Sequence, residues 1–434
     1  MDRAIADVQH ISYILDRGME RNPKAISSWC MYDWANSAFA TTIMAAVLPP
    51  YYGKVAGATL SGNLATVYWG YTNTISMLAI ALFAPILGSI ADHMGMKKGF
   101  LGFFALAGIT ASSSMYLIER GDWLLASFLF IVGEIGFSGS CIFYDSLLPH
   151  IAGPGDMDSV SSKGYALGYL GGGLLLALNL AWISFPELFG FRDSAVACRA
   201  SFLSVGIWWA LFSIPLFLYV PEPPADRRFA GINPISAGFL RLRDTFREVR
   251  RYREAMKFLV AFWLYNDGIG TIIKMATIYG SEIGIGQKEL VGALLMTQFV
   301  GIPFTLLLGR IAGVIGAKRT VIISLIIYTL ISIGGYFMSR AWHFFSLAFA
   351  VGIVQGGSQA LSRSIFGKMI PKAKSAEFFG FYDVSLKFSG IFGPAIFALV
   401  GHISGSSRMS IVSLLFFFLG GALLLSKVRI PENA

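Results

Sequence analysis

The chain has 434 residues, of which 55% are hydrophobic and only 14% are charged, and its mean hydropathy is +0.64. These values exclude a water-soluble globular protein, because the apolar residues come in runs of about 20, long enough to cross a hydrocarbon core of about 30 Å. The formal net charge of +9 does not indicate a nucleic-acid-binding protein, since the basic residues are concentrated in segments between the apolar runs.

The apolar runs predict an all-α membrane protein with twelve transmembrane helices. The expected spans are 28–51, 65–91, 99–118, 123–148, 164–185, 201–220, 257–280, 290–312, 320–338, 342–366, 378–401 and 409–427. Of the 34 Lys and Arg residues, 24 fall on the side that both ends of the chain share, seven on the opposite side and three within spans. This asymmetry follows the positive-inside rule and predicts a multi-pass protein of the cell membrane with both termini in the cytoplasm.

Polar segments divide the chain into five parts. Residues 1–26 are charged, lack the apolar core of a signal peptide and are expected to form a cytoplasmic segment. The spans fall into two groups, at 27–220 and 257–427, and a cytoplasmic tail follows at 428–434. Between the groups, residues 221–256 place apolar side chains on one helical face and Arg on much of the remainder. This pattern predicts an amphipathic basic helix on an anionic membrane surface, and a solvated basic linker is the alternative.

A repeated motif relates the two groups of spans. The stretch from Gly88 to Lys98, GSIADHMGMKK, recurs from Gly309 to Arg319 as GRIAGVIGAKR, at a constant offset of 221 residues. Both glycines, an Ile-Ala pair and two closing cations recur. Internal symmetry between the halves of a very apolar chain is typical of secondary transporters, whose substrate site lies between the halves.

Enzymatic functions find little support. The five His residues are scattered, and the three Cys residues have no metal-ligand spacing. The glycines of 168–173 lie within a predicted span and lack the Lys-Ser/Thr ending of a phosphate-binding loop. The sequence therefore predicts no enzymatic activity, no cofactor and no metal ion.

Ionisable residues within the predicted spans are the main candidates for function. A charge at the bilayer centre costs roughly 2.5–3.5 kcal/mol on insertion scales, so such residues are expected to face a partner or a water-filled path. They are Asp33, Glu134, Asp145, Asp267, Lys274, Arg363, Asp383 and Lys387.

Glu134 and Lys274 are candidates for the substrate or proton pathway. Glu134 lies near the middle of the fourth span, where it is expected to exchange a proton or bind a substrate amine. A buried structural hydrogen bond is the alternative. Lys274, deep in the seventh span, is its candidate ion-pair partner or the ligand of a substrate carboxylate.

Asp33 and Asp267 occupy similar places in the two halves, with Asn36 and Asn266 beside them. Either the two carboxylates bind substrate or protons, or each braces a helix break in its own half. Hydrogen-bonding groups at membrane depth are also expected on this pathway, although they are equally able to bridge helices; they are Gln298, Gln355 and Gln359.

Two further pairs are candidates for gating. Asp383 and Lys387 are four residues apart on one helix and are expected to pair with each other, with a transient gate as the alternative. Asp145 and Arg363 fall near the inner ends of pseudo-equivalent spans. They suit a bridge between the halves that breaks on opening, unless each side chain snorkels separately to the interface.

Several motifs resemble a known family. The stretch from Gly88 to Lys98 resembles the loop between helices two and three of the major facilitator superfamily. The segments YDWANSAF at 32–39, YNDG at 265–268, QALSRS at 359–364 and EFFG at 377–380 are similar to the family of the fungal vacuolar amino-acid effluxer associated with autophagy and its bacterial relatives. The resemblance runs from about residue 28 to 427.

This resemblance implies two pseudo-symmetric six-helix bundles and transport of a small polar metabolite, first an amino acid, by alternating access. We also expect the transport to be coupled to protons, and the protein to be a monomer in contact with membrane lipids. Two alternative functions are efflux of amphipathic or toxic compounds and a role as a non-transporting sensor or scaffold. The resemblance also implies that Asp92 contacts the eleventh span and holds the inner side shut. Gly313 replaces Asp92 in the second copy of the motif, and Lys97 and Lys98 are expected to act only as topology signals at the inner surface.

Overall fold

The computed structural model describes residues 22–430, with gaps at 62–63, most of 226–251, 283–284, 286 and 391. The first half begins with α2 (Pro23–Ala38), which continues through π-helical turns and α3 (Leu48–Tyr51). It then contains α4 (Leu64–Met94), α5 (Lys97–Ser114), α6 (Trp123–Ile151), α7 (Met157–Ser184) and α8 (Ser194–Tyr219). The second half contains α10 (Arg253–Glu282), α11 (Gln287–Ile315), α12 (Ala317–Tyr336), α13 (Ala341–Met369), α14 (Ser375–Phe388), α15 (Phe392–Ser404) and α16 (Ser407–Ser426).

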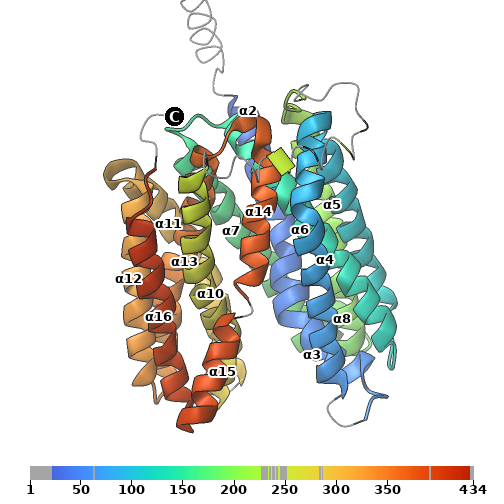
Figure 1. The fold of residues 1–434 in the computed structure, drawn as a ribbon. Coiled ribbons are helices and arrows are strands. Elements are labelled where there is room, and N and C mark those ends of the chain that lie inside the picture. The colour runs from blue at the N-terminus through green and yellow to red at the C-terminus, as the bar shows by residue number, and fades with distance from the viewer. Residues whose placement is uncertain are drawn as a thin grey trace, which may run out of the picture.

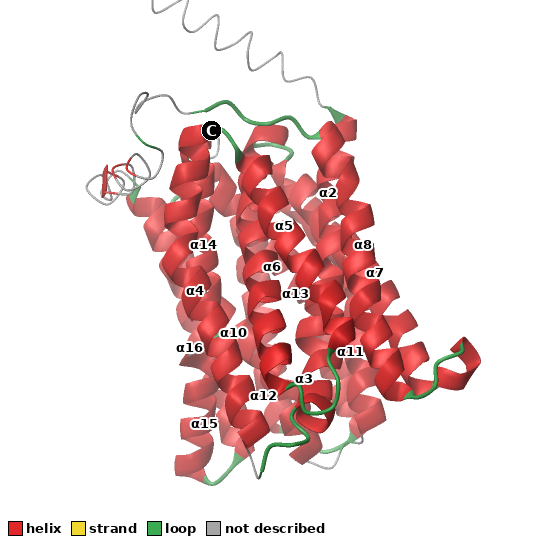
Figure 2. Cartoon of the chain, turned by 90° about the vertical axis from the view of Figure 1, so that its right-hand side faces the viewer, coloured by secondary structure: helices red, strands yellow, loops and turns green. Residues whose placement is uncertain are grey.

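The helices form two bundles, one from each half of the chain, as the sequence predicts (Figure 1). Both described ends of the chain lie at the same end of the molecule, which we name the termini end (Figures 1 and 2). The ribbons of the two bundles approach one another there and diverge toward the opposite, far end. Each bundle has its own hydrophobic core, built around residues such as Trp29 and Trp209 in the first and Tyr328 and Phe418 in the second.

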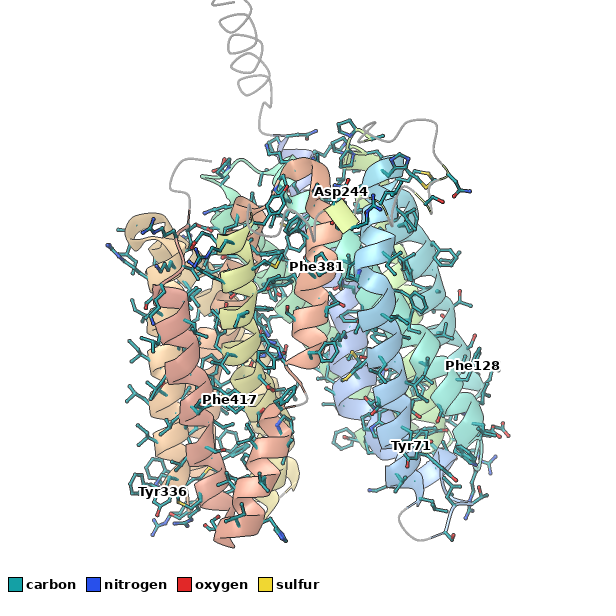
Figure 3. All side chains as sticks on the ribbon, in the orientation of Figure 1. Tyr71, Phe128, Asp244, Tyr336, Phe381 and Phe417 are labelled. Atoms are coloured by element: carbon teal, nitrogen blue, oxygen red, sulfur yellow. The ribbon has the colours of Figure 1, made fainter. Side chains whose placement is uncertain are left out.

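Ten of the described helical segments are long and apolar enough to cross a membrane. The two other predicted spans correspond to α2 with α3 and to α10. The first is interrupted by π-helical turns, and α10 carries buried polar residues such as Asn266 and Asp267. Large apolar side chains on the outer helix faces remain exposed, as lipid contact requires: Tyr71 is 61% and Phe128 62% exposed (Figure 3).

The second glycine of the repeated motif has a positive φ angle in both bundles. Gly95 between α4 and α5 has φ 63°, and Gly316 between α11 and α12 has φ 92°. Glycine adopts this left-handed backbone readily because it has no Cβ. The recurrence of both glycines at one offset therefore reflects a shared backbone requirement.

The eleventh span is broken in a stretch that contains Gly390, Gly393 and Pro394, residue types that favour a bend in a helix. The chain leaves the helix after Phe388 and resumes it at Phe392, so that α14 and α15 are separate helices. The amphipathic helix predicted within 221–256 and the segment 1–26 lie largely outside the described residues.

Candidate functional site

The last turn of α4 places Asp92 against the first turn of α14. Its carboxylate oxygens accept hydrogen bonds from the backbone N–H groups of Ala376, at 3.2 Å, and Glu377, at 2.9 Å. A helix N-terminus offers unpaired N–H groups and a partial positive charge, so a carboxylate is favourable there. Gly88 permits the approach, because a Cβ at this position would overlap the carbonyl oxygen of Ala376. The contact with the eleventh span that the resemblance implies for Asp92 is present.

Lys97 is not an exposed topology signal, and that expectation was wrong. Its side chain is buried, and its Nζ lies 2.8 Å from Asp92 Oδ1. The same Nζ donates to Ser375 Oγ at 2.5 Å and lies 3.0 Å from His150 Nε2. Asp92 compensates the buried charge, while Ser375 extends the contact to the second bundle. Lys97 is therefore part of the contact between the bundles.

Lys98 is also engaged, although within the first bundle. Its Nζ donates to the carbonyl oxygen of Val220, just after α8, at 2.6 Å. Lys318, in the second copy of the motif, donates to the carbonyl oxygen of Val428, after α16, at 2.7 Å. A lysine that donates to the last carbonyl groups of a helix is favourable, because the helix dipole places a partial negative charge at that end.

Arg363 extends from α13 into the first bundle and is the centre of a buried ion-pair network. Its Nη2 lies 3.2 Å from Asp33 Oδ2 on α2, and its Nη1 lies 3.0 Å from Asp145 Oδ1 on α6. Its Nε donates to Ser161 Oγ on α7 at 2.9 Å. The side chain of Arg363 is 2% exposed. The bridge predicted between Asp145 and Arg363 is thus present, and Asp33 shares it.

Aromatic rings enclose this guanidinium group. Its Cζ lies 4.8 Å from the ring centroid of Trp29 and 4.4 Å from that of Tyr165. Tyr144 donates its hydroxyl hydrogen to Asp33 Oδ2 at 2.8 Å. Cation–π contacts in a desolvated site add to the ion pairs, so both the charge and the planar shape of the arginine are used.

A second ion pair joins α7 and α13 nearer the termini end, and sequence reasoning missed it. Lys368 Nζ lies 2.8 Å from Asp158 Oδ2, and the other oxygen of Asp158 accepts a hydrogen bond from Ser364 Oγ. The available signal was an acidic residue in the first turn of a helix and a lysine at the end of another. Spacing along the chain does not say that these two helix ends meet.

Glu134 lies between the bundles and is bound from both sides. It is 0% exposed. Ser76 Oγ of α4 donates to one carboxylate oxygen at 2.5 Å, and Lys387 Nζ of α14 lies 3.4 Å from the other. The predicted ion pair of Lys387 with Asp383 is therefore not formed in this arrangement, because the lysine points across to α6. The alternative partner proposed for Glu134, Lys274, has its side chain outside the described part of the chain.

Asp267 and Asn266 lie at the break between α14 and α15. Asp267 Oδ1 accepts a hydrogen bond from the backbone N–H of Gly393 at 2.9 Å. Asn266 Nδ2 donates to Ser389 Oγ at 2.7 Å. This geometry agrees with the hypothesis that Asp267 braces a helix break in its own bundle. Asp33, the pseudo-equivalent residue in the first half, instead contacts the other bundle.

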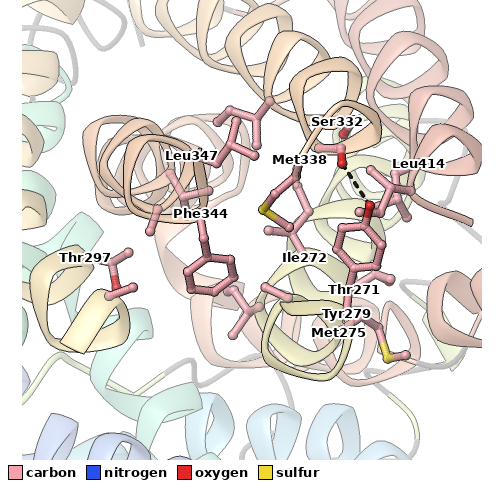
Figure 4. A pocket seen from close by; sticks show the side chains of 18 of the residues that line it. Thr271, Ile272, Met275, Tyr279, Thr297, Ser332, Met338, Phe344, Leu347 and Leu414 are labelled. Carbon is pink, nitrogen blue, oxygen red and sulfur yellow. Dashed lines mark hydrogen bonds between the residues drawn. The ribbon is translucent and has the colours of Figure 1, made fainter. Parts of the chain in front are cut away.

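The remaining predicted pathway residues are dispersed. Asn36 donates to Cys141 Sγ at 3.4 Å, and Gln359 is half-buried on α13. Gln298 and Gln355 line a cavity of about 130 Å³ inside the second bundle. Its other lining residues are mainly apolar and include Ile272, Met275, Tyr279, Met338, Phe344 and Leu347 (Figure 4).

Two carboxylates outside the spans have shifted pKa values. Burial raises the pKa of Glu222, although the backbone N–H of Lys98 binds it. At the start of α10, the backbone N–H of Arg429 and the ammonium group of Lys257 lower the pKa of Glu254. Among the residues described, no group of three or more His, Cys, Asp or Glu side chains is placed to hold a metal ion.

The comparison with known proteins decides the family. Residues 21–433 match the family described as "Vacuole effluxer Atg22 like". The chain belongs to the Atg22-like family. The MFS-type transporter YxiO of Bacillus subtilis is 38% identical over 417 residues, which cover 96% of each chain. Autophagy-related protein 22-2 of Aspergillus clavatus is 23% identical over 505 residues, covering 92% of this chain and 81% of that protein.

Solved structures show the same fold. The proton:xylose symporter XylE superposes with a TM-score of 0.70 at 14% identity, over 94% of this chain and 95% of that one. The transporter FucP in its outward conformation superposes with a TM-score of 0.66 at 12% identity, over 94% and 99%. This Atg22-like protein is therefore a multi-pass transporter of the major facilitator type and not an enzyme, and the family resemblance drawn from its motifs is confirmed.

Proposed function

We propose that this protein carries amino acids across the cell membrane by alternating access, coupled to protons, with its termini end in the cytoplasm. The observation that carries the proposal is the polarity of the ion pairs between the bundles. In each such pair among the described residues, the carboxylate belongs to the first bundle and the cation to the second; the pairs are Asp33 and Asp145 with Arg363, Asp158 with Lys368, and Glu134 with Lys387.

This polarity suits a zwitterion. Separating the bundles leaves carboxylates on one wall and cations on the other, and buried charges without a partner are strongly unfavourable. An amino acid placed with its ammonium group toward Asp33 or Glu134 and its carboxylate toward Arg363 or Lys387 replaces the lost partners. The planar fork of Arg363 also matches the geometry of a carboxylate.

The orientation and the coupling ion rest on separate arguments. The termini end carries most of the Lys and Arg residues, which supports placing it in the cytoplasm. Buried carboxylates that lack a cation take up a proton unless water or substrate reaches them, which supports proton coupling. Asp33 and Glu134 bind cations of the other bundle, so neutralising either carboxylate tests whether these charges are needed for coupled transport.

Uptake into proteoliposomes tests the proposal. Wild-type protein, Asp33→Asn and Glu134→Gln are compared with a panel of labelled amino acids, with and without an imposed pH gradient. The exposed far-end carboxylate of Glu187 provides a matched control as Glu187→Gln. We expect gradient-driven accumulation in wild type and control and its loss in both variants. Accumulation that ignores the gradient would reject the coupling, and no accumulation of any amino acid would reject the substrate class.

One observation favours a second function, the efflux of amphipathic compounds. The cavity in the second bundle is lined mainly by apolar side chains, with Gln298 and Gln355 as its polar members. Efflux would be supported if amphipathic dyes, and no amino acid, were moved by the same proteoliposomes.

A further inference from the structure

Asp383 is a buried carboxylate without a compensating contact. It lies on α14 and is 8% exposed. Its Oδ2 is enclosed and has no hydrogen-bond partner among the residues described. Lys387, one turn along the same helix, directs its Nζ to Glu134 instead. An isolated ionised carboxylate in such a place is strongly disfavoured, whereas a neutral carboxylic acid is tolerated.

Four other carboxylates near the boundary between the bundles each have a cation or a hydrogen-bond donor among the described contacts. Asp33 and Asp145 are paired with Arg363, and Glu134 with Lys387 and Ser76. Asp267 accepts the backbone N–H of Gly393. Asp383 is the member of this set to which the described contacts bring no cation and no hydrogen-bond donor.

The groups around Asp383 come from three packed helices, α4, α6 and α10. The sequence of α4 has no titratable residue between Tyr71 and Asp92. α6 contributes Glu134, Cys141 and Asp145, and α14 itself contributes Lys387. On α10, the Tyr265 hydroxyl is hydrogen-bonded to Ser362 Oγ at 2.6 Å; this helix also carries Asp267 and Lys274, of which the lysine side chain is outside the described part.

We infer that Asp383 carries the exchangeable proton of this transporter, and that Lys387 controls its release by changing partners. With the termini end closed, Lys387 binds Glu134 and Asp383 holds a proton as a neutral acid. When the bundles separate, Lys387 is withdrawn from Glu134 on the opposite bundle. It can then pair with Asp383 four residues away on its own helix, the O–H bond of Asp383 breaks, and the proton passes to water on the open side. Glu134, which keeps its bond from Ser76, faces the same water and remains ionised.

This inference rests on the proposed proton coupling, but its first test needs no substrate. Infrared spectra of the purified protein, grown with isotope-labelled aspartate, report the C=O stretch of a protonated carboxyl group as a label-sensitive band. We expect this band in wild type at neutral pH and its complete loss in Asp383→Asn. Asp267→Asn is the matched control, because it removes a buried aspartate that already has a donor, and the band should persist.

A conservative variant shows whether the band is lost because the carboxyl group is removed or because the protein misfolds. In Asp383→Glu the band should return without label sensitivity, because the proton then lies on glutamate. Persistence of the labelled band in Asp383→Asn or Asp383→Glu, or its absence from wild type, would overturn the inference.

Transport assays distinguish a failure of this inference from a failure of the proposed function. Asp383→Asn should lose accumulation driven by a pH gradient while it retains exchange of labelled for unlabelled substrate, which needs no net proton movement. Gradient-driven accumulation that survives in Asp383→Asn would refute the inference and leave the proposed function intact. If the wild-type protein accumulates no amino acid but shows the Asp383-dependent band, the proposed substrate class is rejected and the proposed proton site at Asp383 is retained.

Discussion

Replacing Arg363 with Ala is expected to release the two bundles from one another at the termini end. The guanidinium group compensates Asp33 and Asp145 at 3.2 and 3.0 Å. Its removal leaves two carboxylates in a site that the aromatic rings shield from water, and breaking a buried pair in this way costs about 3–5 kcal/mol. At about 1.4 kcal/mol per factor of ten, the open arrangement should gain population by roughly a hundredfold to a few thousandfold.

Cys30 is expected to report this change. It lies on α2 close to Asp33, is 2% exposed, and its Sγ is 3.7 Å from the carbonyl oxygen of Val160 on α7. The rate of Cys30 alkylation, resolved from the other cysteines by mass spectrometry, should rise steeply in Arg363→Ala. Arg363→Lys should be intermediate, because lysine keeps the charge but cannot span two carboxylates with a planar fork.

The control for this prediction is Arg310→Ala, which removes an exposed arginine of α11. Its Cys30 alkylation rate should equal that of the wild type. If Arg363→Ala folds with a normal thermal transition and alkylates Cys30 no faster than Arg310→Ala, then the network around Arg363 does not hold the termini end closed. The proposed role of the inter-bundle charges would then be untenable.

Three further changes probe neighbouring contacts. Gly88→Ala should keep α4 and α14 apart and speed Cys30 alkylation, because the new Cβ would overlap the backbone of α14. The control Gly70→Ala places a Cβ in open space and should leave the alkylation rate unchanged. Asp92→Asn should lower the free energy of unfolding by about 3–5 kcal/mol, because it leaves the buried ammonium group of Lys97 without its counter-charge at 2.8 Å. A denaturation series that shows no loss would contradict this. The pKa of Glu254 lies below its ordinary value of 4.5 in the folded protein, so its ionised form stabilises the fold above pH 4.5. This stabilisation is lost as the pH falls through the lowered pKa. The thermal midpoints of wild type and Glu254→Gln should therefore converge on acidification.

The architecture could be predicted because it depends on local signals. Runs of apolar residues fix the number of spans, and the glycines and proline near residue 393 mark the break in the eleventh. The turns at Gly95 and Gly316 follow from a backbone requirement that the repeat displays directly. Each of these features is decided within about one helical turn or by the bilayer thickness.

The partners of the charged side chains could not be predicted in the same way, because they depend on which helix faces meet. Asp383 and Lys387 have the spacing of a helical ion pair, yet the lysine binds Glu134 on α6. Lys97 stands at a span end, where lysines normally reach water, and is instead buried against α14. A spacing rule applies to an isolated helix, and contacts between bundles override it.

The divergence of Asp33 and Asp267 shows why the internal symmetry of the chain misleads at the site. Asp267 is used inside its own bundle, where it binds the N–H of Gly393 at the start of α15. Asp33 has no such helix break to brace and is free to contact Arg363 across the boundary. The same asymmetry appears in the repeated motif, where Gly313 replaces Asp92. In the ion pairs between the bundles, the second bundle thus supplies the cations and the first supplies the carboxylates. Under the proposed function, this opposition would let one boundary bind a zwitterion when it opens and close on itself when it is empty.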